Sequence, residues 1–367
     1  MNINKIAKAE GLSNLEVLST FQVNKLCTSV SSKLSKLFFE YDLSEEHLFA
    51  VLKSLNMYSA EFKDKNVSAK YHYQTNTIFI DNSLDLCCPD SVLIHECLHF
   101  LQSEIEKGRV IQMGLFNVRS YTNKGLALNE ASVQTIASQV SNIKPSSLKY
   151  FDMYFTTPSP DYYPLETTLL KQMSYFTGTY PLIYSTIYST SLFKDVFSAI
   201  TSKKQYEEIS KKMNKLLYLQ EKFLKAEEEN NDSEKENIKD AFKRDIQWMV
   251  SDIQKSIFEN AFTKQFKKIQ NMQDIRNFRA SLYNFNNYLI EIPEDKSFEQ
   301  FRDSITSDLI SLEIELSQKG YIENININKS LSPINNYSFR YFKIFFNKLK
   351  INAEILFRIR QKEGDYY

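Results

Sequence analysis

The chain has 367 residues, with 45 Lys and Arg balanced by 45 Asp and Glu, so its formal net charge is zero. This balance excludes the basic footprint of a nucleic-acid-binding protein. Glycine (7) and proline (8) are scarce, which excludes collagen-like and turn-dense β-sandwich architectures and predicts a chain that is mostly helix.

Elements are predicted from the spacing of apolar residues. Residues 1–60 are expected to be helical, because apolar side chains recur at helical spacing between Leu15 and Leu55, and Lys63–Lys70 is expected to be a polar loop. The pattern changes at Tyr71–Tyr73 and Thr77–Ile80, two β-prone runs separated by a turn-like spacer, which predict strands. Pro89-Asp90-Ser91 then predicts the start of a helix that runs to Gly108.

A short strand is expected at Arg109–Met113, and a helix from about Leu126 to Val140. Beyond Pro145 the chain is expected to be helical almost to its end. The predicted fold class is therefore α+β with a predominance of helix, in three segments. These are an N-terminal helical segment (1–66), a core with a small sheet (67–142) and a helical C-terminal subdomain (143–367).

The residues His95-Glu96-Cys97-Leu98-His99 form an HExxH motif on the helix predicted after Pro89. Positions i and i+4 share one helix face, so the two imidazoles can bind one zinc ion from adjacent turns. Glu96 can then take a proton from water at the open position of the metal. The chain has only four histidines, and about 0.003 such motifs are expected by chance.

A catalytic zinc site needs a third protein ligand. No histidine follows His99, so a downstream third ligand has to be a carboxylate or a thiolate. Glu130, in the sequence Asn129-Glu130-Ala131 on the next predicted helix, is the candidate.

The HExxH motif followed by Asn-Glu-Ala on a second helix resembles the gluzincin, or thermolysin-like, branch of the zinc metallopeptidases. The resemblance covers about residues 70–140. It implies a zincin-like core with one zinc ion per chain, held by His95, His99 and Glu130, and with Glu96 as the general base. It also implies that Thr77–Ile80 is the edge strand that aligns a peptide substrate.

The chain departs from the gluzincin pattern at two places. An aspartate usually follows the third ligand by four residues and orients a zinc-bound histidine, whereas this chain has Gln134 there. An amide can still accept a hydrogen bond from an imidazole but adds no negative charge. No downstream histidine is present to stabilise an oxyanion, so a tyrosine is expected to replace it. Six are candidates: Tyr121, Tyr154, Tyr162, Tyr163, Tyr175 and Tyr180.

Other residues near the motif that could be mistaken for ligands are expected to serve in packing or on a solvated surface: Cys87, Cys88, Cys97, His72, Glu104 and Glu106.

The predicted function is hydrolysis of peptide bonds in a peptide or protein substrate. One alternative is a helical regulatory or interaction protein whose zinc site is structural or inactive, and another is a helical scaffold that binds no zinc. We expect no nucleic-acid partner and no transmembrane segment, and the oligomeric state is left open. A cytoplasmic location is expected, because the N-terminal sequence lacks the apolar core of a signal peptide. Export without a cleaved signal would leave no trace in the sequence.

Overall fold

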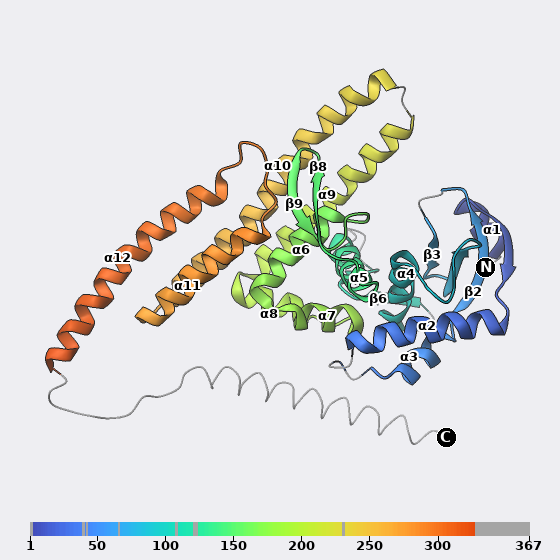
Figure 1. The fold of residues 1–367 in the computed structure, drawn as a ribbon, viewed down its shortest axis with the longest axis horizontal. Coiled ribbons are helices and arrows are strands. Elements are labelled where there is room, and N and C mark those ends of the chain that lie inside the picture. Colours follow the sequence, from blue (N-terminus) through green and yellow to red (C-terminus); the bar gives the residue numbers. More distant parts are fainter. Residues whose placement is uncertain are drawn as a thin grey trace. The chain divides into compact units, whose positions relative to one another are not determined.

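The computed structural model describes residues 3–38, 41, 43–64, 67–106, 109–119, 124–229 and 232–326. Helices and small sheets alternate in the first half, and helices dominate the second half, so the predicted α+β class with a predominance of helix is confirmed (Figure 1). The elements up to residue 140 are α1 (Ile3–Ala9), β1 (Leu12–Val17), α2 (Thr20–Phe38), α3 (Glu45–Leu52), β2 (Asn56–Phe62), β3 (Ala69–His72), β4 (Thr77–Asp81), α4 (Ser91–Leu101), β5 (Ser103–Glu106), β6 (Arg109–Met113), β7 (Phe116–Asn117) and α5 (Leu126–Val140).

The main sheet has the strand order β1-β2-β4-β3. Strand β4 is parallel to β2 and antiparallel to β3, and apolar side chains on both of its faces are buried. Ile78 and Ile80 belong to the large core that includes α2, α3, α4 and α5, whereas Phe79 packs in a smaller cluster with α1. Helices therefore cover both faces of this sheet.

Two expectations for the sheet are wrong. The N-terminal segment is not wholly helical, because β1 and β2 supply two of the four strands. Leucine and valine spaced three or four apart fit a helix, but pairing between distant segments decides these two strands. Thr77–Ile80 is not an edge strand, because β4 pairs on both sides; the two edges of this sheet are β1 and β3.

Helix α4 carries the HExxH motif and begins at a well-formed cap. The carboxylate of Asp90 accepts a hydrogen bond from the Leu93 N–H at 2.8 Å and another from Ser68 Oγ at 2.9 Å. The helix ends at Leu101, earlier than expected, because Ser103–Glu106 forms strand β5 paired with β6. Gly108, the expected stop, lies outside the described residues.

The elements after residue 140 are β8 (Ser146–Tyr150), β9 (Met153–Thr157), α6 (Pro164–Thr177), α7 (Thr179–Tyr188), α8 (Leu192–Ile200), α9 (Lys203–Glu229), α10 (Asp232–Phe266), α11 (Met272–Phe285), the short 3-10 helix η2 (Asn286–Tyr288) and α12 (Ser297–Asn326). The β8–β9 hairpin corrects the expectation of continuous helix beyond Pro145. The strands β3, β4 and β6 and helix α5 are confirmed.

The chain separates into two compact units, residues 1–313 and 314–367. Within the first unit, α5 packs against α4, α6, α7 and α9, so segments from both halves of that unit meet at α5. The three predicted segments stay a prediction. None of the helices in the described part of the chain has both the length and the apolar composition needed to span a bilayer.

A buried carboxyl group joins α6 to α9. Glu166 has no exposed surface; one of its oxygens accepts a hydrogen bond from the Gln220 amide, and the other has no hydrogen-bond partner in the described structure. Burial raises the pKa of Glu166 from 4.5 to about 7. The folded state therefore favours the protonated form of this group.

We expect the stability of the protein to depend on pH through the ionisation of Glu166. The folded-state pKa lies above the ordinary value, so the free energy of unfolding should fall as pH rises from about 4.5 to 7. Glu166→Gln should remove on the order of 3 kcal/mol of that fall, as measured by urea unfolding between pH 5 and 8 with a chelator present. Glu16→Gln, at an exposed position, is the control. If the free energy of unfolding of Glu166→Gln fell with pH as steeply as that of the wild type, Glu166 would not be the cause of the fall.

Candidate metal centre

Three side chains from two packed helices meet at one point. His95 and His99 lie on adjacent turns of α4, and their Nε2 atoms are 2.8 Å apart. Glu130 of α5 places Oε2 at 3.2 Å from His95 Nε2 and 3.4 Å from His99 Nε2. The histidines are 5% and 6% exposed, so they are almost fully shielded from water. The sequence-predicted ligands therefore come together as one group that can hold a metal ion.

The spacing of these three atoms suits a small tetrahedral cation. Bonds of about 2.0–2.1 Å place tetrahedral ligand atoms roughly 3.3 Å apart. The observed separations of 2.8, 3.2 and 3.4 Å bracket that value, so only small side-chain shifts are required.

The amide of Gln134 holds His95 in the form that binds a metal. Gln134 Oε1 lies 2.9 Å from His95 Nδ1. A carbonyl oxygen only accepts, so Nδ1 must carry the proton and Nε2 is left with its lone pair directed at the site. The prediction that an amide at this position accepts from an imidazole agrees with this contact.

Gln102 contacts the second histidine, His99. Its Nε2 donates to His99 Nδ1 at 2.8 Å, and its Oε1 is buried without a hydrogen-bond partner among the described residues. A metal on His99 Nε2 requires a proton on Nδ1, and hence an acceptor facing it. Rotating the amide by 180° supplies that acceptor and turns the unpartnered oxygen into an N–H donor.

Two other oxygen atoms surround the same point near Gly114 as the Gln102 oxygen. Gln102 Oε1, Asn129 Oδ1 and the Thr186 carbonyl oxygen lie 2.4, 2.5 and 2.9 Å from the point where a Cβ on Gly114 would sit. Gly114 has φ +53°, and its missing side chain leaves room for this crowding of acceptors. A rotated Gln102 amide would therefore direct its N–H toward this group of oxygens.

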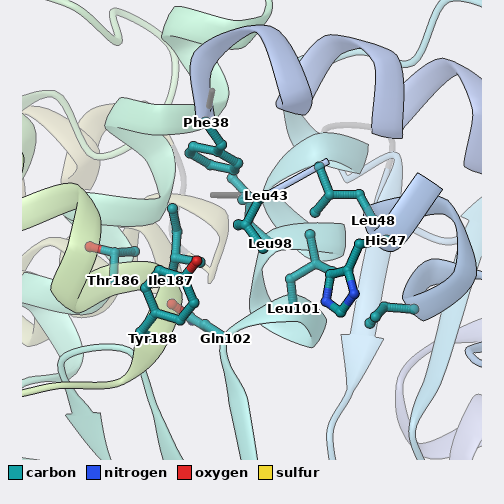
Figure 2. Close-up of a pocket in the computed structure, with 11 residues that line it drawn as sticks. Phe38, Leu43, His47, Leu48, Leu98, Leu101, Gln102, Thr186, Ile187 and Tyr188 are labelled. Carbon is teal, nitrogen blue, oxygen red and sulfur yellow. The ribbon is translucent and has the colours of Figure 1, made fainter. Parts of the chain in front are cut away.

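Figure 2 shows an apolar pocket beside α4, with Gln102 at its wall. Its volume is about 270 Å³. Its walls come from α2, α3, α4, α7 and the segment before α3, through Phe38, Leu43, His47, Leu48, Val51, Leu98, Leu101, Gln102, Thr186, Ile187 and Tyr188. The side chain of Gln102 thus contacts His99 and also lines this pocket.

Glu96 leans toward the edge strand. Its Oε2 accepts a hydrogen bond from the Tyr71 main-chain N–H at 2.8 Å. Burial raises the pKa of Glu96 to about 7, although the interaction with His95 and the hydrogen bond from Tyr71 act against that rise. A carboxyl group with a pKa near neutrality is suited to accept and return a proton.

Tyr163 is the tyrosine that the structure brings to the site. Its ring stacks on His95 with centroids 6.0 Å apart, and its hydroxyl group interacts with the Glu130 carboxylate. The charge of Glu130, together with burial, raises the pKa of Tyr163 well above 10, so the phenol stays a neutral donor. The sequence placed Tyr163 among six candidates; its position just before Pro164, at a helix start, was the only local signal.

The carboxylate of Glu130 stays ionised beside these groups. Burial opposes its charge, but the interactions with His99 and His95, whose Nε2 atoms lie 3.4 and 3.2 Å away, outweigh burial and hold the pKa of Glu130 below the ordinary value. The site therefore presents a negatively charged carboxylate next to two imidazole nitrogens.

The other candidates lie away from this point or serve elsewhere. Cys97 is buried in the core, as expected, but Cys87 and Cys88 are exposed, which corrects the expectation that they pack. They lie in a surface turn where the Cys87 N–H bonds to Asp85. His72 bonds to Thr75 in the turn after β3.

The remaining tyrosines are accounted for as far as the structure describes them. Tyr175 donates to the Ser281 carbonyl, Tyr180 stacks on Tyr41, and Tyr154 is about half exposed on β9. Tyr162 lies beside Tyr163, where burial raises its pKa. Tyr121 lies outside the described residues. Glu104 and Glu106 are exposed on β5, as expected for a solvated face.

Comparison of the chain with protein-family models, with curated proteins and with solved structures gave no significant match. The interpretation of the site therefore depends on its own geometry.

Gln102→Leu should weaken zinc binding about 10–100-fold, because His99 Nδ1–H would lose its acceptor. Competition with a chromophoric chelator measures this. Gln112→Leu is the matched control, since the Gln112 amide donates to the Gly114 and Ser189 carbonyls and contacts neither histidine. Equal affinities for the two variants would contradict the role of Gln102.

Proposed function

We propose that the chain is a zinc-dependent peptidase in which His95, His99 and Glu130 hold the metal and Glu96 is the general base. The observation that carries this proposal is the meeting of the two imidazoles and Glu130 in one buried group, with Glu96 on the same helix turn as His95. Zinc in such a site acts as a Lewis acid and lowers the pKa of water.

The chain's own residues supply the other parts of hydrolysis. Glu96 takes the proton from the attacking water and delivers it to the leaving nitrogen. Tyr163, a neutral phenol beside Glu130, donates a hydrogen bond to the oxygen that gains negative charge. Hydrolysis needs one group that accepts a proton and another that donates a hydrogen bond. The environment of Glu96 suits the first role, and the environment of Tyr163 suits the second.

The edge strand supports a peptide as the substrate class. Strand β3 pairs with β4 on one side, and α4 packs against it. An extended peptide can pair with such an edge through main-chain hydrogen bonds, which places its carbonyl groups along the helix that carries the metal ligands.

The alternative proposal is a regulatory protein with a structural metal. The bond between Glu96 and the Tyr71 N–H favours it, because this bond occupies the carboxylate that would act as base. The two proposals make different predictions for the loss of that carboxylate.

Glu96→Gln should lower hydrolysis of a peptide library by about 10²–10⁴-fold while one zinc per chain is retained, because the amide cannot accept the proton. Elemental mass spectrometry and product analysis check the two parts. Glu130→Ala should lose or sharply weaken the zinc. Glu104→Gln, exposed on β5, is the control. A wild-type protein that binds zinc but hydrolyses no peptide would favour the structural metal. Retained activity in Glu96→Gln would contradict the role of Glu96 as the general base.

Tyr163→Phe should reduce kcat by about 10²-fold with zinc content unchanged, because one donor to the developing charge is removed. Steady-state kinetics on the best library substrate measure this. The neighbouring Tyr162→Phe should keep the wild-type kcat, since its hydroxyl interacts with other groups. A wild-type kcat in Tyr163→Phe would assign the donor elsewhere.

A further inference from the structure

The segment that carries Tyr163 has an unusual backbone. Tyr163 adopts φ +51° immediately before α6, a left-handed conformation that is uncommon for a bulky residue and needs support from its surroundings. Part of that support comes from Ser159, which is 1% exposed and whose Oγ donates to the Tyr162 carbonyl at 2.6 Å. Ser159 thus anchors the peptide unit that precedes Tyr163.

Gln134 joins this anchor to a predicted metal ligand. Its Oε1 accepts from His95 Nδ1 at 2.9 Å, and its Nε2 donates to Ser159 Oγ at 3.0 Å. The same Nε2 also reaches Ser138 Oγ at 3.2 Å, one turn along α5. Gln134 is 2% exposed, so water does not compete for these bonds.

The donors along this path all have the same direction. His95 Nδ1–H donates to Gln134, Gln134 donates to Ser159, and Ser159 donates to the carbonyl of Tyr162. Hydrogen bonds arranged in one direction in a dry environment polarise and strengthen one another. A cation on His95 Nε2 makes Nδ1–H a stronger donor, so its effect passes along the whole path.

We propose that Gln134 and Ser159 are positioning residues that couple metal binding at His95 to the placement of Tyr163. This inference rests on the proposed metal site and on the proposed role of Tyr163. We call the chain of hydrogen bonds from His95 through Gln134 and Ser159 to the Tyr162 carbonyl the relay. In the zinc-bound protein the relay holds the segment from Ser159 to Tyr163 in the conformation that places the Tyr163 phenol beside Glu130. Without the metal, the same segment is held less firmly.

The relay explains the amide at position 134. A carboxylate there would accept from His95 more strongly, but it has no proton to give to Ser159. An amide accepts a hydrogen bond through its oxygen and donates one through its nitrogen. The glutamine can therefore accept from His95 and donate to Ser159, which continues the donors in one direction. The absence of negative charge at this position is therefore a condition of the coupling.

Hydrogen–deuterium exchange of peptides covering residues 157–164, with and without zinc, tests the proposal on the full chain. In the wild type, zinc should slow exchange in this segment about tenfold. Ser159→Ala and Gln134→Glu should still bind zinc, with affinities within about tenfold of wild type, but should show less than twofold slowing. Ser159→Ala should also lower kcat about tenfold at constant KM.

Two variants serve as controls. Ser138→Ala removes the other acceptor of the Gln134 amide without touching the Tyr163 segment, so it should behave as wild type. Ser159→Thr keeps the hydroxyl and should restore the slowing, which separates loss of the bond from general damage to the fold.

Zinc that binds Ser159→Ala and slows exchange as in the wild type would overturn the coupling and leave the peptidase proposal standing. A wild-type chain that binds no zinc would overturn both.

Discussion

The meeting of two imidazoles and a carboxylate inside an apolar layer is the constraint on which the rest of the site depends. Leu93, Ile94, Cys97 and Leu98 surround the motif on α4 and are almost fully buried, so polar groups there need partners. His95, His99 and Glu130 are partners of one another, at distances of 2.8, 3.2 and 3.4 Å. Around this group lie two glutamine amides, Gln134 and Gln102, each bonded to one imidazole.

Both amides are electrically neutral, and this matters because the site already contains carboxyl groups. Glu130 stays ionised beside the imidazoles, whereas burial raises the pKa of Glu96 to about 7. A further carboxylate in place of either glutamine would add an unpaired negative charge in a buried environment. The neutral amides orient the two imidazoles without adding charge. In the proposed metal site, they would also make the imidazoles less basic ligands than carboxylates would.

The parts of this site that sequence could predict are the local ones. His95, Glu96 and His99 share a helix turn, so their relation follows from helical geometry, and Glu130 lies on the next strongly apolar helix. Gln102 directly follows the end of α4, and Tyr163 directly precedes the start of α6. The direction of each side chain depends on local backbone geometry, namely the end of α4 for Gln102 and the left-handed φ for Tyr163. Neither feature leaves a periodic signal. Strands β1 and β2, and the identity of β3 as the edge, depend on pairing across the chain, which spacing along it does not encode.

The contact between Glu96 and Tyr71 N–H connects the sheet to the chemistry of the helix. In the antiparallel pair of β3 and β4, alternate residues of β3 direct their main-chain groups away from β4. The Tyr71 N–H is one of these, and it is bonded to Glu96. A peptide that adds to this edge would compete for the same N–H, so its arrival and the release of the carboxylate would be linked. In the proposed peptidase, this would free the base at the strand where the peptide carbonyl is presented, and a single hydrogen bond would link substrate docking to the readiness of Glu96.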